Sequence, residues 1–145
     1  MKYQAQLVHQ HEILWNLLNS IPAIVSAAPG GIYGPPGTPD DWTPENGRTL
    51  VFLGGSFTEN SDMPTTQNQY RILCYGQDGI DAANLYRIVY ANLHRRGSEV
   101  VPITGGNALF IYAKQTSGPN DNTDSSSGWN WCWGMWEIHL AENYI

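Results

Sequence analysis

The sequence is poor in charged residues, and above all in positive ones. Charged residues make up 14% of its 145 positions, and 7 lysines and arginines stand against 13 acidic residues, giving a formal net charge of −6. Soluble domains usually carry about a quarter charged residues, and a face that binds nucleic acid needs clustered cations to neutralise phosphates. Arg95 and Arg96 form the only basic pair, and a helix end explains it better. The composition therefore argues against a nucleic-acid-binding surface.

Cysteine and long hydrophobic runs are scarce as well. Cys74 and Cys132 each sit within a short apolar stretch, which favours two buried thiols over a disulfide. No run reaches the length of a membrane-spanning helix, and the opening residues have neither the apolar core nor the cleavage site of a signal peptide. We therefore expect one domain over residues 1–145, folded in the cytoplasm and without a membrane partner.

Catalytic and metal-binding motifs are missing too. His9 and His11 are two residues apart and would point in different directions on a helix, and the cysteines form no Cys-x-x-Cys pair. The stretch DNTDSSSG lacks the glycine and glutamate of a calcium loop, and no phosphate loop or nucleophile elbow occurs. Adjacent Asp40 and Asp41 lie in a Pro-rich stretch, where such residues are usually solvated turn formers. The sequence predicts no enzyme, no cofactor and no metal site.

Hydrophobic periodicity predicts an α+β fold, with two helices packed on a mostly antiparallel sheet of four or five strands. The first helix is expected over 7–20 and is stopped by Pro22. A long Pro/Gly-rich arm follows over 27–47, ordered but without a regular element. A polar loop is expected at 116–128. The expected strands are 48–57 with a bulge at Gly54–Gly55, 69–76, 98–104, 107–115 and 129–140.

The second helix is the best specified element. Asp78 is suited to cap its amino terminus, with Asp81 at the third helical position. Arg95 and Arg96 complement the dipole at its carboxyl end, and Gly97 offers a left-handed stop. The apolar stripe expected to be buried against the sheet consists of Leu85, Ile88, Val89 and Leu93.

Four of the six tryptophans fall within GWNWCWGMWEIHL, residues 128–140. The first three are at odd positions, whereas the fourth shares its parity with Ile138 and Leu140. Either a bulge at Gly134 brings all of them to one face, or the carboxyl half packs on the helices and the amino half projects towards a neighbouring subunit. No cation or paired carboxylate is near to orient a base or a sugar. We expect packing and protein contact without a small-molecule ligand, with Trp129 the most exposed of these four tryptophans and a core of Trp136, Ile138 and Leu140.

In their order along the chain, these stretches resemble the tail terminator (tail completion, head–tail joining) proteins of long-tailed bacteriophages. A first helix passes into IPAIVSAAPGGIYGPPG, and the strand TLVFLGGSF precedes the strand–helix unit YRILCYGQDGIDAANLYRIVYANLHRRG. The last two strands are ALFIYAKQ and WCWGMWEIHL. The family has no invariant catalytic motif, so the resemblance rests on this arrangement.

The resemblance implies a non-enzymatic virion protein of the tail neck, assembled in the host cytoplasm. Its implied partners are further copies of itself in a homohexameric ring, the tail tube protein that the ring caps, and the head–tail connector or stopper. An acidic chain suits a channel through which DNA passes without binding. We expect the arm to lie against a neighbouring chain. The candidate contact residues are Tyr33, Asp40, Asp41, Trp42, Trp129 and Trp131.

Three alternatives stay open at this point. The first is another neck protein, such as a stopper or an adaptor. The second is a Trp-rich carbohydrate-binding module, and the third is a small hydrolase that would use the weak carboxylate clusters. Glycan binding by a monomer would favour the second alternative over a ring-forming protein.

Overall fold

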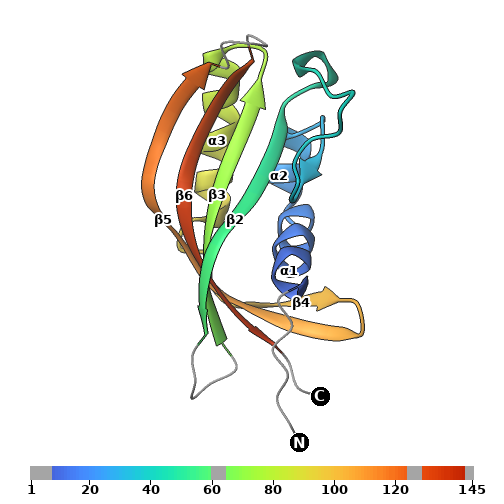
Figure 1. The fold of residues 1–145 in the computed structure, drawn as a ribbon, viewed down its shortest axis with the longest axis vertical. Helices are drawn as coiled ribbons and strands as arrows, with labels where there is room; N and C mark the ends of the chain where they lie inside the picture. Colours follow the sequence, from blue (N-terminus) through green and yellow to red (C-terminus); the bar gives the residue numbers. More distant parts are fainter. Residues whose placement is uncertain (1–7, 60–64, 124–128, 143–145) are drawn as a thin grey trace, which may run out of the picture.

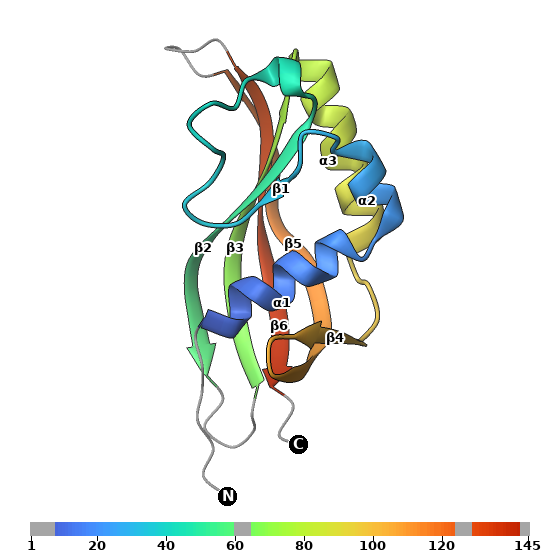
Figure 2. The ribbon, with the colours of Figure 1, turned by 90° about the vertical axis from the view of Figure 1, so that its right-hand side faces the viewer.

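The computed structural model describes residues 8–59, 65–123 and 129–142. It is an α+β fold, as expected, in which a curled six-stranded sheet holds the helices on one side (Figures 1 and 2). The strand order is β1-β2-β3-β6-β5-β4, and only β1 and β2 run parallel. The helices are α1 Val8–Asn19, α2 Pro22–Ala27 and α3 Gly79–Leu93. The strands are β1 Ile32–Tyr33, β2 Thr49–Glu59, β3 Thr65–Gly76, β4 Glu99–Ile103, β5 Gly106–Thr123 and β6 Asn130–Glu142.

The first half of the chain contains three short elements that the sequence pattern did not predict. Helix α1 ends at Asn19, before Pro22, as expected, but Pro22 then opens the unpredicted short helix α2, because proline is well tolerated in a first helical turn, where its missing N–H has no partner to lose. The arm was expected to hold no regular element, yet it contains β1 and the 3₁₀ turn η1, Pro44–Asn46. Ile32 pairs with Leu50 of β2, so the arm begins as an edge strand of the sheet.

The expected bulge in β2 is present, since the β2–β3 register shifts between Gly54 and Ser56. The prediction of a loop at 116–128 is wrong for residues 116–123. Residues 116–123 continue β5 and pair with β6 as far as Thr123 and Asn130, whereas residues 124–128 lie outside the described part of the chain. β5 reaches this length through three irregularities, with extra residues at Ile111, at Thr116 and around Gly118–Pro119. Polar turn formers therefore sit inside a bulged strand here.

Helix α3 begins as expected and ends differently. The Asp78 carboxylate accepts a hydrogen bond from the Asp81 N–H (2.8 Å), which satisfies a free donor of the first turn. At the other end the left-handed residue is Arg95 (φ 58°) and not Gly97. The Arg95 N–H donates to the Ala113 carbonyl of β5 (2.8 Å), a tertiary bond that fixes the turn. Leu85, Val89 and Leu93 are fully buried, while Ile88 is only partly buried.

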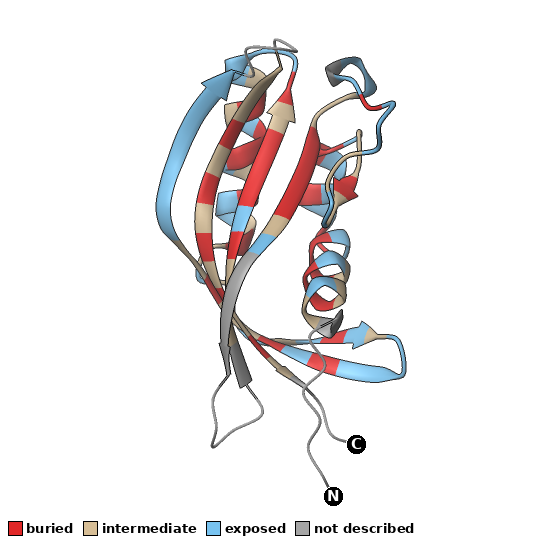
Figure 3. Cartoon of the chain, in the orientation of Figure 1, coloured by how far each residue is buried: buried red, intermediate tan, exposed pale blue. Residues whose placement is uncertain are grey.

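The tryptophan-rich strand β6 alternates without interruption. It pairs with β3 in one register from Asn130 to Ala141, so the bulge considered at Gly134 does not occur. From Trp131 to Ala141 its even-numbered residues are buried and its odd-numbered residues are half-buried (Figure 3). The expected core residues Trp136, Ile138 and Leu140 are buried. The odd-numbered tryptophans therefore lie on the outer face of the sheet, away from α3.

A buried hydroxyl ties α3 to both β5 and β6. The Tyr86 hydroxyl accepts a hydrogen bond from the Trp136 indole N–H (3.0 Å) and donates to the Gln115 side-chain carbonyl. Gly134 lies beside this hydroxyl, and a Cβ at Gly134 would overlap it. Only glycine therefore lets the α3 tyrosine reach the strand.

This arrangement predicts a coupled pair of substitutions. Gly134→Ala should lower the free energy of unfolding by about 1–3 kcal/mol, because the added methyl group overpacks the site. Tyr86→Phe should also cost about 1–3 kcal/mol, since it leaves the buried Trp136 N–H without its acceptor. Because the second change relieves part of the overlap, the double variant should lose less than the sum of the two. Urea denaturation of all four proteins measures this; strict additivity would contradict the contact.

Candidate protein-interaction surfaces

The outer face of the sheet carries a row of aromatic rings, which we call the aromatic ladder and which consists of Tyr75, Trp131 and Trp133. Tyr75 is the direct cross-strand partner of Trp131. Their ring centroids are 6.1 Å apart with planes at 10°, and the Trp131 and Trp133 centroids are 6.4 Å apart at 24°. The Arg71 guanidinium lies over the Trp133 ring, 5.4 Å from its centroid, in a cation–π contact. All three ladder residues are half-buried.

The arm is fastened to the end of this ladder by Trp42. The Trp42 ring meets Trp129 edge to face, with centroids 4.5 Å apart at 89°, and packs against Tyr75 at 5.2 Å. Its indole N–H donates to the buried Thr49 hydroxyl (2.6 Å). Trp42 is only 2% exposed. We expected it to anchor the arm to a neighbouring chain, but it anchors the arm to its own chain, and Trp129 beneath it is half-buried like the other outer tryptophans.

The rest of the arm combines internal hydrogen bonds with an exposed acidic tip. Tyr33 is half-buried and donates its hydroxyl proton to the Gly30 carbonyl (3.0 Å). Asp40, Asp41 and Glu45 are exposed, and none of them has an ion-pair partner within the described residues. The arm is thus ordered, and its carboxylates face solvent. Contact between the arm and a neighbouring chain stays a prediction.

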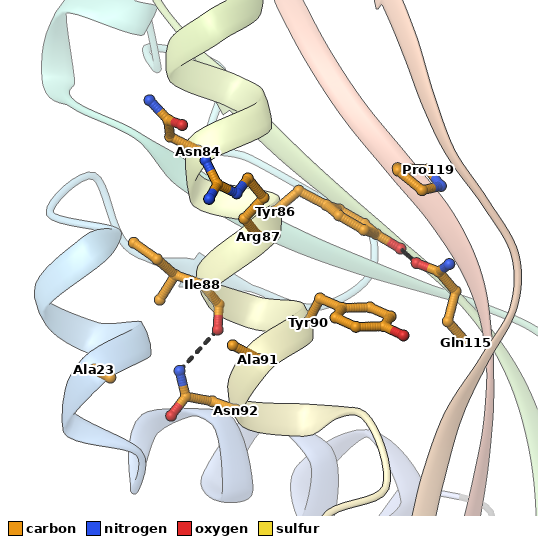
Figure 4. Close-up of a pocket in the computed structure, with 10 residues that line it drawn as sticks. All are labelled: Ala23, Asn84, Tyr86, Arg87, Ile88, Tyr90, Ala91, Asn92, Gln115 and Pro119. Carbon is orange, nitrogen blue, oxygen red and sulfur yellow. Dashed lines mark hydrogen bonds between the residues drawn. The ribbon is translucent and has the colours of Figure 1, made fainter.

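A groove on the helical side of the molecule was missed by the sequence reading. It has a volume of about 930 Å³ and lies over α3 between α2 and the bulged half of β5 (Figure 4). Arg87 and Tyr90 of α3 are exposed at its surface. In the sequence these residues belong to the polar face of an amphipathic helix, and the hollow arises only because β5 continues to Pro119 beside the helix. Its lining includes Ala23, Arg87, Ile88, Tyr90, Gln115 and Pro119.

The described residues contain no group of three or more histidine, cysteine or carboxylate side chains that could hold a metal ion. His11, by its Nδ1, lies 3.0 Å from the Tyr70 hydroxyl, and burial lowers the pKa of this histidine. His94 accepts a hydrogen bond from the Gln115 N–H, and His139 lies near Glu137. In the part of the chain that the structure describes, no helix is both long and apolar enough to cross a membrane.

The two cysteines are direct neighbours, which the sequence could not tell. Cys74 of β3 and Cys132 of β6 are cross-strand partners, and both are buried free thiols, as expected. Burial raises the pKa of the Cys74 thiol well above its ordinary value and raises that of Cys132 to about 12. Both side chains therefore stay protonated near neutral pH.

This predicts slow thiol chemistry in the folded protein. Because the thiolate is the reactive species, the two cysteines should react with a disulfide reagent far more slowly in native protein at pH 8 than in protein unfolded in urea, where thiol pKa values return to about 8.5. Labelling should rise only as the pH approaches the raised pKa values. Rapid labelling of both thiols in native protein at pH 8 would contradict their burial.

The position of Trp42 predicts that its loss is structural. Trp42→Ala should lower the free energy of unfolding by about 3–5 kcal/mol, since it empties a buried site. Trp131→Ala is a matched control on the half-buried ladder and should cost clearly less. Denaturant melts compare the two variants. If both cost the same, or Trp42→Ala costs nothing, the arm is not held by its tryptophan.

Comparisons with known proteins give no family assignment. No protein-family model matches the chain, and no curated protein matches it.

Proposed function

We propose that this chain is a structural virion protein of a long-tailed phage, which forms a ring that caps the tail tube and joins the tail to the head connector. The observation that carries the proposal is the outer face of the sheet. A half-buried aromatic ladder on a domain surface is typical of a site for lasting protein contact, since aromatic residues are enriched there and large apolar patches are rarely left exposed.

The order of elements supports the same proposal. The strand–helix unit that carries the resemblance to tail terminators corresponds to β3 and α3, which pack together in the core. A ring of identical subunits needs two different surfaces on each copy, because the contact is head to tail. The ladder with the arm on one side, and the α3 groove on the other, are two such surfaces. The net charge of −6 suits a channel for DNA.

The charge and the surfaces also fit another neck protein, such as a stopper or an adaptor. That alternative shares the ring and differs in the partners on its two faces. Reconstitution with tail tubes separates the two, because a terminator binds the tube end and stops its growth.

A carbohydrate-binding module is the second candidate, and one observation favours it. Near-parallel aromatic rings with Asn120 and Asn122 at the neighbouring register positions of β5 are groups that sugar-binding faces use. The ring environment weighs against it. Trp131 lies between Tyr75 and Trp133, and Arg71 covers Trp133. With the Asn122 amide oriented so that its oxygen faces the indole, the Trp133 N–H donates to that oxygen at 2.8 Å, so fewer ring faces and donors are left for a sugar.

The test measures the mass of the purified protein and then its binding. Mass photometry and negative-stain imaging should show closed rings, with a hexamer as the expected species. A Trp131→Ala, Trp133→Ala double variant should stay folded but lose ring formation or docking to tail tubes. A protein that stays monomeric at all concentrations, and binds a glycan array through the ladder, would replace the ring proposal with the sugar-binding one.

A further inference from the structure

We propose that the acidic tip of the arm of one copy docks into the α3 groove of a second copy, with Asp40 and Asp41 facing Arg87. The inference rests on the proposed self-assembly and names the contact that would close the ring. It joins two surfaces that are each incomplete in the single chain: a groove with an unpaired cation, and a proline-rich tip with unpaired carboxylates.

Among the lysines and arginines of the described residues, Arg87 and Arg95 have neither an ion pair nor a cation–π contact, and of the two only Arg87 lines the groove. Arg48, Arg96 and Lys114 each form an ion pair with a carboxylate, and Arg71 lies on the Trp133 ring. Arg87 has no ion pair with any described carboxylate, although the chain carries a net charge of −6. It is exposed and lines the groove, so its guanidinium is available to an acidic partner.

The lining of the groove matches the arm in a second respect. Around Arg87 the groove presents Ile88, Tyr90 and Ala23, with the amide of Gln115 at one end (Figure 4). The arm tip has the complementary composition, because exposed Pro35, Pro36 and Pro39 precede its carboxylates. Prolines offer apolar surface and lose little conformational freedom on binding. A hollow of about 930 Å³ is in the size range of pockets that hold small ligands, and suits a few such residues.

The carboxylates of the arm have no competing partner within the described chain. Asp40 and Asp41 are exposed and in no ion pair, and Trp42 holds the segment next to them in place. The tip is thus preorganised by its own chain before it meets a neighbour. Preorganisation of this kind raises affinity because less order has to be imposed on binding.

The arm cannot reach the groove of its own chain. Figure 2 shows the arm on the side of the sheet opposite to α3, and Trp42 fixes it against the outer aromatic rings. The contact must therefore join two copies. It is heterologous, because it uses different surfaces on each copy, and such contacts generate rings when the rotation between copies closes.

The test is a charge exchange between the two surfaces. Arg87→Glu, and separately the double change Asp40→Lys with Asp41→Lys, should each raise the concentration at which the assembly dissociates by about tenfold or more, because like charges then face each other. The triple variant with both surfaces reversed should recover a large part of the assembly. Arg95→Glu is the matched control, since it is an exposed cation with the same charge change that lies outside the groove lining; it should assemble like wild type.

Mass photometry across a dilution series measures each variant, with circular dichroism to show that it is folded. The wild-type assembly should also weaken as sodium chloride is raised, a readout that needs no variant. If wild type is monomeric, the proposed ring fails and this contact fails with it. If wild type assembles but Arg87→Glu does so equally well, or the reversed triple variant recovers nothing, the arm–groove contact alone is overturned.

Discussion

Strand β6 pairs with β3 along one unshifted register, and this constraint assigns every side chain of the tryptophan-rich segment to a face. The even-numbered residues from Cys132 to Leu140 are buried, and among them Trp136 donates to Tyr86 of α3 and Gly134 leaves room for its hydroxyl. The odd-numbered residues are forced outward, where they build the aromatic ladder. A shift of one residue would exchange the two faces. Core stability and the outer surface are therefore set by the same register.

The outer face in turn decides where the arm lies. Trp129, at the end of β6, offers the ring against which Trp42 packs, and Thr49 of β2 offers the acceptor for its indole N–H. Because Trp42 is buried there, the proline-rich segment that precedes it lies on the outer side of the sheet. The helical side carries a groove where the outer side carries aromatic rings and the arm, because α3 and the long β5 leave a hollow between them. The molecule thus presents two unlike surfaces across a thin sheet.

The fold class, both long helices and the buried set of β6 could be predicted because they follow from local patterns: a cap at Asp78, apolar spacing along α3 and parity along β6. The predictions that were wrong concern features set by contacts with residues far away in the sequence. Residues 116–123 read as a loop because they are polar and contain Gly118 and Pro119, and only pairing with β6 makes them a strand. Trp42 was predicted to contact a neighbouring chain. Its burial against its own chain could not be predicted, because a residue within a proline-rich arm has no periodic pattern that would indicate burial. The groove is formed where α2, α3 and β5 lie side by side, and no local sequence pattern indicates such an arrangement.

The shape of β5 affects the tendency to aggregate through open strand edges, to which any protein with a β-sheet is exposed. β4 pairs with only the first five residues of β5, Gly106–Phe110, and among the described strands none covers its far edge from 111 to 123. A long open edge is a template for runaway stacking of strands into aggregates or fibrils. The irregularities at Ile111, Thr116 and Gly118–Pro119 interrupt the row of backbone donors and acceptors. Pro119 also lacks a backbone N–H and cannot donate a hydrogen bond. These features make the open edge of β5 a poor template for fibril growth.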